Sequence, residues 1–185
     1  MKLLAVLLGI LSLMMTSQLN AAPPSLSVEQ KARNDGLYLF KTLCGKEEKV
    51  ELIMLVKTAP PEIGAYTKEL SAQARESLAL IEELQKESPS IKLDQEPLPQ
   101  VEVDTRASIQ EDKQHSLLFG TKGPAFSRAL VVTQIEACMY AKHLTLVLAK
   151  NVKRESQQKA LLKNSAQWDK LMEKGFTLLG SKVVR

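Results

Sequence analysis

The longest strongly apolar segment beyond the N-terminus runs from Pro124 to Asn151. Its apolar side chains recur at helical spacing, and most of them fall on one face of a helix. That face comprises Phe126, Ala129, Leu130, Thr133, Ala137, Tyr140, Ala141, Leu144, Val147 and Leu148. Pro124 suits the first turn, where its missing N–H costs nothing. The pattern therefore predicts a long helix over this segment.

The other side of this predicted helix is also apolar. Five residues point away from the main face: Val131, Val132, Ile135, Met139 and Leu146. A helix that is apolar nearly all round needs burial on more than one side. The favoured interpretation is a central helix of one bundle, because large exposed apolar patches are uncommon on monomers. The alternative is that these five residues form a contact surface for a protein partner or a second copy.

The first helix of the remaining chain is predicted from Val28 to about Lys57. Ser27 suits its N-cap, and Gln30 stands at the capping-box position. Gly45 weakens the helical pattern and marks a kink or a short break. The helix is expected to stop before the two consecutive prolines that follow.

Two further amphipathic helices are predicted. One runs from about Pro61 to Glu87 and the other from about Glu155 to Leu179, each with apolar side chains on one face and charged ones on the other. Gly180 suits the C-cap of the last helix. The turns that precede these two helices are short, so each helix should pack antiparallel to its predecessor.

The connection between the second and third long helices is much longer. Ser88–Gln100 holds three prolines and predicts an extended segment, and a short helix is expected over Asp104–Leu118. A connection of this length can return along the bundle. The predicted fold class is therefore all-α: a four-helix up-down bundle of the ferritin-like type, with a long crossover that carries a short extra helix.

The N-terminus has the layout of a secretory signal peptide. One lysine precedes an apolar run from Leu3 to Met15, and small residues follow at Ala21 and Ala22. We expect cleavage after Ala21, which divides the chain into a signal peptide (1–21) and one helical-bundle domain (22–185). The apolar run is too short for a stable anchor. The mature protein is expected to be exported to the periplasm, the cell envelope or the medium, without a transmembrane anchor.

Charge does not indicate a nucleic-acid partner. The chain has 25 Lys and Arg against 21 Asp and Glu, a net charge of +4. The signal peptide removes Lys2, and the remaining excess is spread along the chain rather than gathered in a patch. Nucleic-acid binding proteins concentrate their positive charge on one face. No nucleic-acid partner is therefore expected, whereas a protein partner or self-association stays open.

The only two cysteines are Cys44 and Cys138. An oxidising compartment lets such a pair persist as a disulfide. A Cys44–Cys138 bridge is therefore predicted, because the protein is expected to be exported and has an even number of cysteines. It would close a long loop. On the entropic model, the restriction of the unfolded chain would stabilise the fold by roughly 4 kcal/mol. Two buried free thiols are the alternative. A thiol-based redox role for the pair is a further, weaker hypothesis.

The chain offers few residues for metal or catalytic chemistry. A di-iron bundle needs two Glu-x-x-His motifs, and none occurs; the nearest spacing is Asp112 and His115, in the crossover. Glu48, Glu51 and His143 are weak metal candidates, the two glutamates because they follow the Cys44 face if the first helix is continuous. No nucleophile elbow, phosphate loop or zinc spacing occurs. No catalytic residue and no cofactor is therefore predicted.

Two segments resemble a known family. YTKELSAQARESLALIEELQKE (Tyr66–Glu87) and GPAFSRALVVTQIEACMYAKHLTLVLAK (Gly123–Lys150) are similar to an exported bacterial ferritin-like domain of unknown function, labelled "predicted outer membrane protein". The resemblance covers most of the chain from about Lys46. It implies a signal peptide, a helix pair, a long connection and a second helix pair.

The family's histidines are not matched. Its second helix has an Asp-His pair where this chain has Gln73 and Ala74, and a second histidine falls at Cys138, preceded by Ala137. Any ligand chemistry of the family is therefore not carried over to these positions. The function expected is that of a non-catalytic, exported helical-bundle protein of the bacterial periplasm or envelope that acts by binding or assembly. The alternative is a metal-binding or oxidoreductase ferritin-like protein with an altered site.

Overall fold

The computed structural model describes residues 26–181, which are helical and contain no strand. The predicted signal peptide (1–21) lies outside the described residues. The helical elements are α1 (Val28–Glu47), the 3₁₀ helix η1 (Val50–Leu55), α2 (Pro61–Glu87), α3 (Gln100–His115), the π-helical turn η2 (Ser116–Gly120), α4 (Gly123–Lys150) and α5 (Glu155–Gly180). The prediction of an all-α protein is confirmed.

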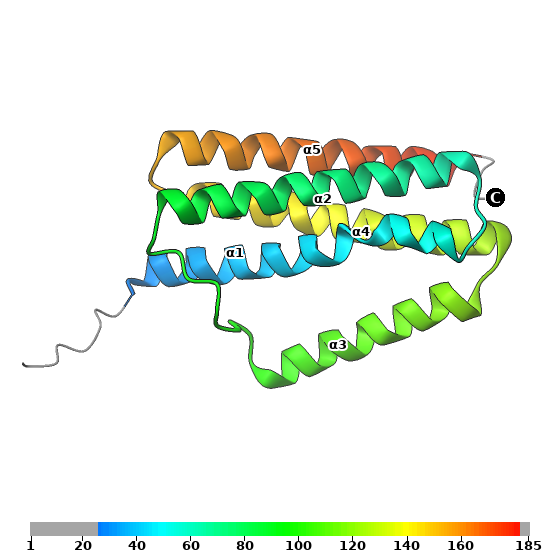
Figure 1. Cartoon of the computed structure of the whole chain (residues 1–185), viewed down its shortest axis with the longest axis horizontal. Helices are drawn as coiled ribbons and strands as arrows, with labels where there is room; N and C mark the ends of the chain where they lie inside the picture. Colours follow the sequence, from blue (N-terminus) through cyan, green and yellow to red (C-terminus); the bar gives the residue numbers. More distant parts are fainter. Residues whose placement is uncertain (1–25, 182–185) are drawn as a thin grey trace, which may run out of the picture.

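Helices α1, α2, α4 and α5 pack side by side as a bundle (Figure 1). The packed pairs are α1–α2, α1–α4, α2–α5 and α4–α5, and each pair runs antiparallel. Two contacts fix the direction of each pair. They are Asn34–Ser90 and Glu47–Ser71 for α1–α2, and Gly36–Leu148 and Glu47–Gln134 for α1–α4. They are Tyr66–Leu171 and Glu87–Gln157 for α2–α5, and Ile135–Gly175 and Lys142–Asp169 for α4–α5. It follows that α2 and α4 run in the same direction, joined by residues 88–122.

The first helix begins as predicted but ends early. Ser27 and Gln30 form the capping box, with their side chains bonded to each other's backbone N–H. The helix was expected to continue to about Lys57, and this prediction is wrong: α1 ends at Glu47, and a separate 3₁₀ helix follows. The break lies two residues beyond Gly45, the glycine that marked a kink or a short break in the sequence.

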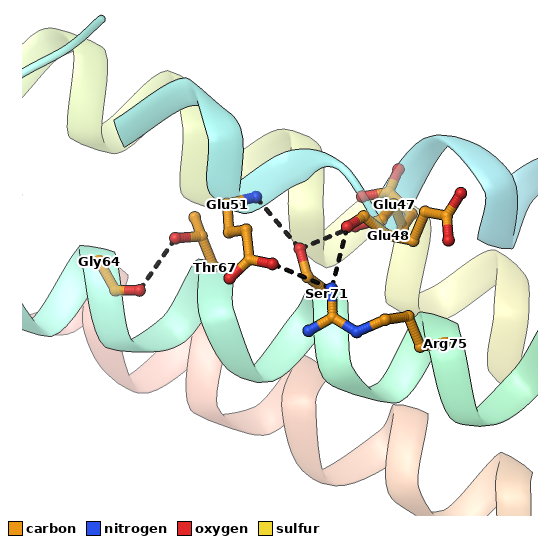
Figure 2. Close-up of polar contacts among 7 residues, drawn as sticks. All are labelled: Glu47, Glu48, Glu51, Gly64, Thr67, Ser71 and Arg75. Carbon is orange, nitrogen blue, oxygen red and sulfur yellow. Dashed lines mark hydrogen bonds and ion pairs between the residues drawn. The ribbon is translucent and has the colours of Figure 1, made fainter. Parts of the chain in front are cut away.

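Side chains of α2 hold the broken segment in place (Figure 2). The Ser71 hydroxyl donates to the Glu47 carbonyl and accepts from the Glu51 N–H. Arg75 donates to the Glu48 carbonyl and pairs with the Glu51 carboxylate at 2.9 Å. These bonds replace part of the helical ladder that the break interrupts. The chain can therefore leave the helix here without stranding its backbone groups.

The buried face of α4 differs from the predicted one. Val131 and Ile135 are 0% and 5% exposed, whereas Tyr140 and Val147, expected on the core face, are 39% and 54% exposed. The difference arises because α4 packs against both α1 and α5, which buries a wide and rotated sector of its surface.

The predicted contact surface on α4 therefore contains fewer residues than expected. Val131 and Ile135 belong to the core, and only Val132 and Met139, at 42% and 43% exposure, lie on the surface, with Leu146 half-buried. A contact role for the two exposed side chains stays a prediction.

We expect Gly175→Ala to destabilise the fold by about 1–3 kcal/mol. A Cβ at this position would lie 2.6 Å from Ile135 Cγ1 and 2.6 Å from the Tyr66 hydroxyl, so α4 and α2 would have to shift. The crowding outweighs the gain in helix propensity, which is at most about 1 kcal/mol. Gly64→Ala is the control, because a Cβ there meets nothing within 4 Å and should stabilise. Urea unfolding measures both, and equal stabilisation by the two alanines would contradict the expected close approach.

Candidate functional site

One buried polar cluster joins α2 to α5 and has its hydrogen bonds satisfied. The Ser77 oxygen accepts from Asn164 Nδ2 at 3.0 Å and from Trp168 Nε1 at 3.1 Å, and it donates to the Gln73 carbonyl at 2.9 Å. Ser77 and Trp168 are fully buried, and Asn164 is 8% exposed. Because every partner is internal, this cluster stabilises the bundle and offers nothing to a ligand.

The predicted disulfide is wrong: Cys44 and Cys138 are both free and buried. Cys44 lies beside Ser77, whereas Cys138 bonds to Tyr66. Each thiol thus has its own hydrogen-bond partner on α2 rather than a bond to the other thiol.

The chemistry of both thiols is that of inert core residues. Burial raises the pKa of each thiol to about 12, and hydrogen bonds to Ser77 and Tyr66 offset only part of that rise. The thiolate is the reactive form of cysteine, so neither side chain is suited to the redox role that was a weaker hypothesis.

Both cysteines are expected to resist alkylation in the folded protein and to react fully in the unfolded one. With a pKa of about 12, only about one thiol in 10⁵ is ionised at pH 7. Mass spectrometry after iodoacetamide treatment should show no label under native conditions and two labels in guanidinium without reductant. If the unfolded protein gained its labels only after reduction, the two cysteines would be bridged after all.

The three metal candidates do not converge. Glu51 pairs with Arg75, as Figure 2 shows, while Glu48 lies in the irregular segment after α1 and His143 is exposed on α4. Within residues 26–181 no group of three or more His, Cys, Asp or Glu side chains is placed to hold a metal ion. The Asp112 and His115 spacing lies on α3, which is solvent-exposed there.

Helix α3 stands apart from the bundle of the four long helices (Figure 1). No residue of α3 is buried, and the π-helical turn after it buries only Leu117. Polar contacts tie the crossover to the bundle: Lys113 to Glu136 at 2.6 Å, and Tyr38 to Glu96 at 3.0 Å. Polar contacts to α1 and α4 thus hold the crossover against the bundle.

Two cavities lie beside α3. The first, of about 320 Å³, has apolar walls from α1, α3 and the extended segment before α3. The second, of about 310 Å³, lies between the end of α1, η1, η2 and α4. Both are lined by Lys46, Glu47 and Gln110, so they adjoin at the C-terminal end of α1. We call these adjoining cavities the α3 groove.

Glu47 lies at the centre of the α3 groove. Its Oε2 is fully enclosed and has no hydrogen-bond partner, and none of the ion pairs found among residues 26–181 involves this carboxylate. Burial raises the pKa of Glu47 to about 7, against smaller lowering effects from Lys46, a Gln134 hydrogen bond and Lys113. The Glu47 carboxyl is thus about half ionised near pH 7, where an ordinary glutamate carries its full charge.

Gln134 completes the polar end of the groove. It is 3% exposed, lines the second cavity, and its Oε1 has no hydrogen-bond partner. Neither Glu47 nor Gln134 was among the candidates from the sequence. Glu47 does stand beside a predicted kink, and a break in a helix at a glutamate is the one signal that pointed to it.

Comparisons with protein-family models, with curated proteins and with solved structures found no match for this chain. The resemblance to the exported ferritin-like family therefore stays a prediction. None of the helices in residues 26–181 combines the length and the apolar character that crossing a membrane requires.

Proposed function

We propose that this protein is a non-catalytic, exported helical-bundle protein of the bacterial periplasm or cell envelope, and that it acts by binding a small molecule in the α3 groove. The observation that carries the proposal is the combination of a loosely held α3 with two adjoining cavities of about 320 and 310 Å³. Such volumes suit small organic ligands, and few well-placed polar groups among apolar walls are typical of their sites.

Native mass spectrometry of the full protein, released from the periplasm of an expressing bacterium, tests this proposal. The expected result is a chain that lacks residues 1–21 and carries a non-covalent adduct of small mass. An adduct-free protein, or a chain that keeps its N-terminus and stays in the cytoplasm, would contradict the binding role or the export respectively.

A matched pair of variants shows where the adduct binds. Ala107 lines the first cavity, and Ala107→Trp should fill it and remove the adduct. Ser108 is the neighbouring exposed residue and lines neither of these cavities, so Ser108→Trp should keep the adduct. Loss of the adduct in both variants, or in neither, would place the ligand outside the α3 groove.

The same proposal includes a ferritin-like arrangement of the four long helices. It is supported by the antiparallel packing of all four neighbouring pairs and by the parallel direction of α2 and α4. The metal-binding or oxidoreductase alternative, with Glu48, Glu51 and His143, gains no support, since within residues 26–181 no group of three or more His, Cys, Asp or Glu side chains is placed to hold a metal ion. We therefore propose the bundle as a scaffold for the groove rather than as a metal centre.

A further inference from the structure

A further cavity, of about 380 Å³, lies beside the N-terminal end of α1 and shares no lining residue with the α3 groove. Its walls come from the first two turns of α1, the residue that follows α2, the turn between α4 and α5, and the first turn of α5. We call it the α1–α5 cavity. Every residue that lines it is polar or charged, and the neutral ones are Ser27, Gln30, Ser88, Asn151 and Gln157. The α1–α5 cavity therefore suits a polar ligand rather than an apolar one.

Positive charge predominates in the α1–α5 cavity. Three cations, Arg33, Lys153 and Arg154, line it against the single carboxylate of Glu29, an excess of two positive charges. Lys153 lies 3.8 Å from Glu29, and Arg154 lies 3.6 Å from the adjoining Glu87, so both pairs are too long for hydrogen bonds. Exposed pairs of this kind are weak, and positive charge exceeds negative charge even when Glu87 is counted. The cavity therefore favours an anion.

Arg33 supplies a positive charge without a carboxylate partner. Its Nε and Nη2 donate to the Asn34 side-chain oxygen at 3.3 and 3.2 Å, and Nη2 also donates to the Ser90 hydroxyl at 3.1 Å. These neutral oxygens hold the guanidinium in place, while Nη1 has no partner among residues 26–181. The side chain is half-buried, and burial lowers the pKa of Arg33 from its usual value. An anion in the cavity would supply the counter-ion that this partly desolvated charge lacks.

From this arrangement we propose that the α1–α5 cavity binds a small phosphate monoester, with its phosphate group on the Arg33 guanidinium and close to the charges of Lys153 and Arg154. A phosphate monoester carries about 1.5 to 2 negative charges at pH 7 and three acceptor oxygens, which suits an excess of positive charge and the fork of an arginine. A carboxylate offers one charge only. The cavity is comparable in width to the Debye length of about 8 Å at physiological salt, so all three cations act on a phosphate inside it.

The rest of the cavity suits a small hydroxylated body on that phosphate. The neutral lining groups are hydroxyls and amides, which donate and accept hydrogen bonds. The inference is independent of the proposed function, because the α1–α5 cavity and the α3 groove have no residue in common.

Calorimetric titration of the full mature protein with glycerol 3-phosphate at pH 7.5 and low salt tests the proposal. Saturable binding with a Kd below about 1 mM is expected. Glycerol lacks the charge and should not bind, and glycerate, with one carboxylate charge, should bind at least about fivefold more weakly. Inorganic phosphate, which has the charge without the hydroxylated body, should also bind more weakly than the ester. Absence of saturable binding, or equal binding of any of these three probes, would overturn the proposal.

Two variants assign the binding to Arg33. Arg33→Gln should weaken glycerol 3-phosphate binding at least about tenfold, as expected for the loss of a charge-assisted hydrogen bond. Lys41→Gln is the matched control, because Lys41 is an exposed cation of the same helix that does not line the cavity, so the affinity should not change. Equal affinity in wild type and Arg33→Gln, or an equal loss in both variants, would contradict a phosphate site at Arg33.

A third variant keeps the proposal testable if Arg33→Gln does not fold. The Lys153 side chain is 90% exposed, so Lys153→Gln should keep the fold and weaken the ester about threefold through the lost charge. Unchanged affinity in Lys153→Gln would place the ester outside this cavity. Ala107→Trp, which fills the first cavity of the α3 groove, should leave the affinity for glycerol 3-phosphate unchanged. Loss of ester binding in Ala107→Trp would assign the ester to the α3 groove and overturn the inference without touching the proposed function.

Discussion

Ser77→Ala is expected to lower the free energy of unfolding by about 3 kcal/mol or more. The substitution removes the one oxygen that accepts from both Asn164 Nδ2 and Trp168 Nε1. Each buried donor left without an acceptor costs about 1–3 kcal/mol. No water can replace the oxygen cheaply, since Ser77 and Trp168 are fully buried between α2 and α5. Urea unfolding followed by circular dichroism measures the loss.

The same substitution at Ser127 is the matched control for Ser77. Ser127 is also fully buried in a long helix, but its hydroxyl has no hydrogen-bond partner. Ser127→Ala therefore removes a buried unsatisfied group and improves helix propensity, and we expect no loss or a gain of about 1 kcal/mol. If both alanine variants lost stability equally, the cost would come from the missing volume rather than from the Ser77 hydrogen bonds.

The helices were predictable because their signals are local. The capping box at Ser27 and the proline start of α2 at Pro61 depend on nearby residues, and the elements begin at these positions. The end of α5 was predicted within one residue: Gly180, the expected C-cap, is its last residue and Ser181 is the C-cap. Helical periodicity also identified α4, whose bounds agree with the prediction within one residue. Local chemistry decides where a helix begins and stops, so a single sequence suffices for this part.

The early end of α1 depends on tertiary contacts and was missed for that reason. Residues Val50–Leu55 are dense in apolar side chains and continue a helical pattern, yet Ser71 and Arg75 of α2 hold them in a separate 3₁₀ helix. The hydrophobic periodicity of a segment reflects that segment alone. It therefore does not reveal hydrogen-bonding side chains that another helix supplies.

The candidate site follows from this break. Glu47 is the last residue of α1, and its carboxyl lies at the junction of α1, α3 and α4. From the sequence, the neighbouring Glu48 and Glu51, and not Glu47, were expected to follow the inward Cys44 face of a continuous helix. Which glutamate is enclosed is decided by the turn after Glu47, so it could not be predicted before the break was known. The family resemblance instead singled out Cys138, which stands where the family has a histidine, but Cys138 is an inert core residue.

Glu47 is expected to make the stability of the free protein fall as the pH rises from about 4.5 to about 7. Burial raises the pKa of this carboxyl from 4.5 to about 7 in the folded state. Between these values the folded protein holds a proton that the unfolded chain has lost, so raising the pH favours unfolding. The shift corresponds to about 3 kcal/mol, present as stability below pH 4.5 and lost once the pH passes 7.

Glu47→Gln removes this dependence, because an amide is neutral at every pH in the range. The variant should therefore match the wild type near pH 4.5 and exceed its stability by up to about 3 kcal/mol at pH 8. Glu48→Gln retains Glu47 and should keep the wild-type dependence on pH. Urea unfolding at half-unit steps from pH 4.5 to 8 measures all three proteins. A wild type whose stability stays level or rises over this range, with Glu47→Gln parallel to it, would show that the Glu47 carboxyl is solvated rather than enclosed in the α3 groove.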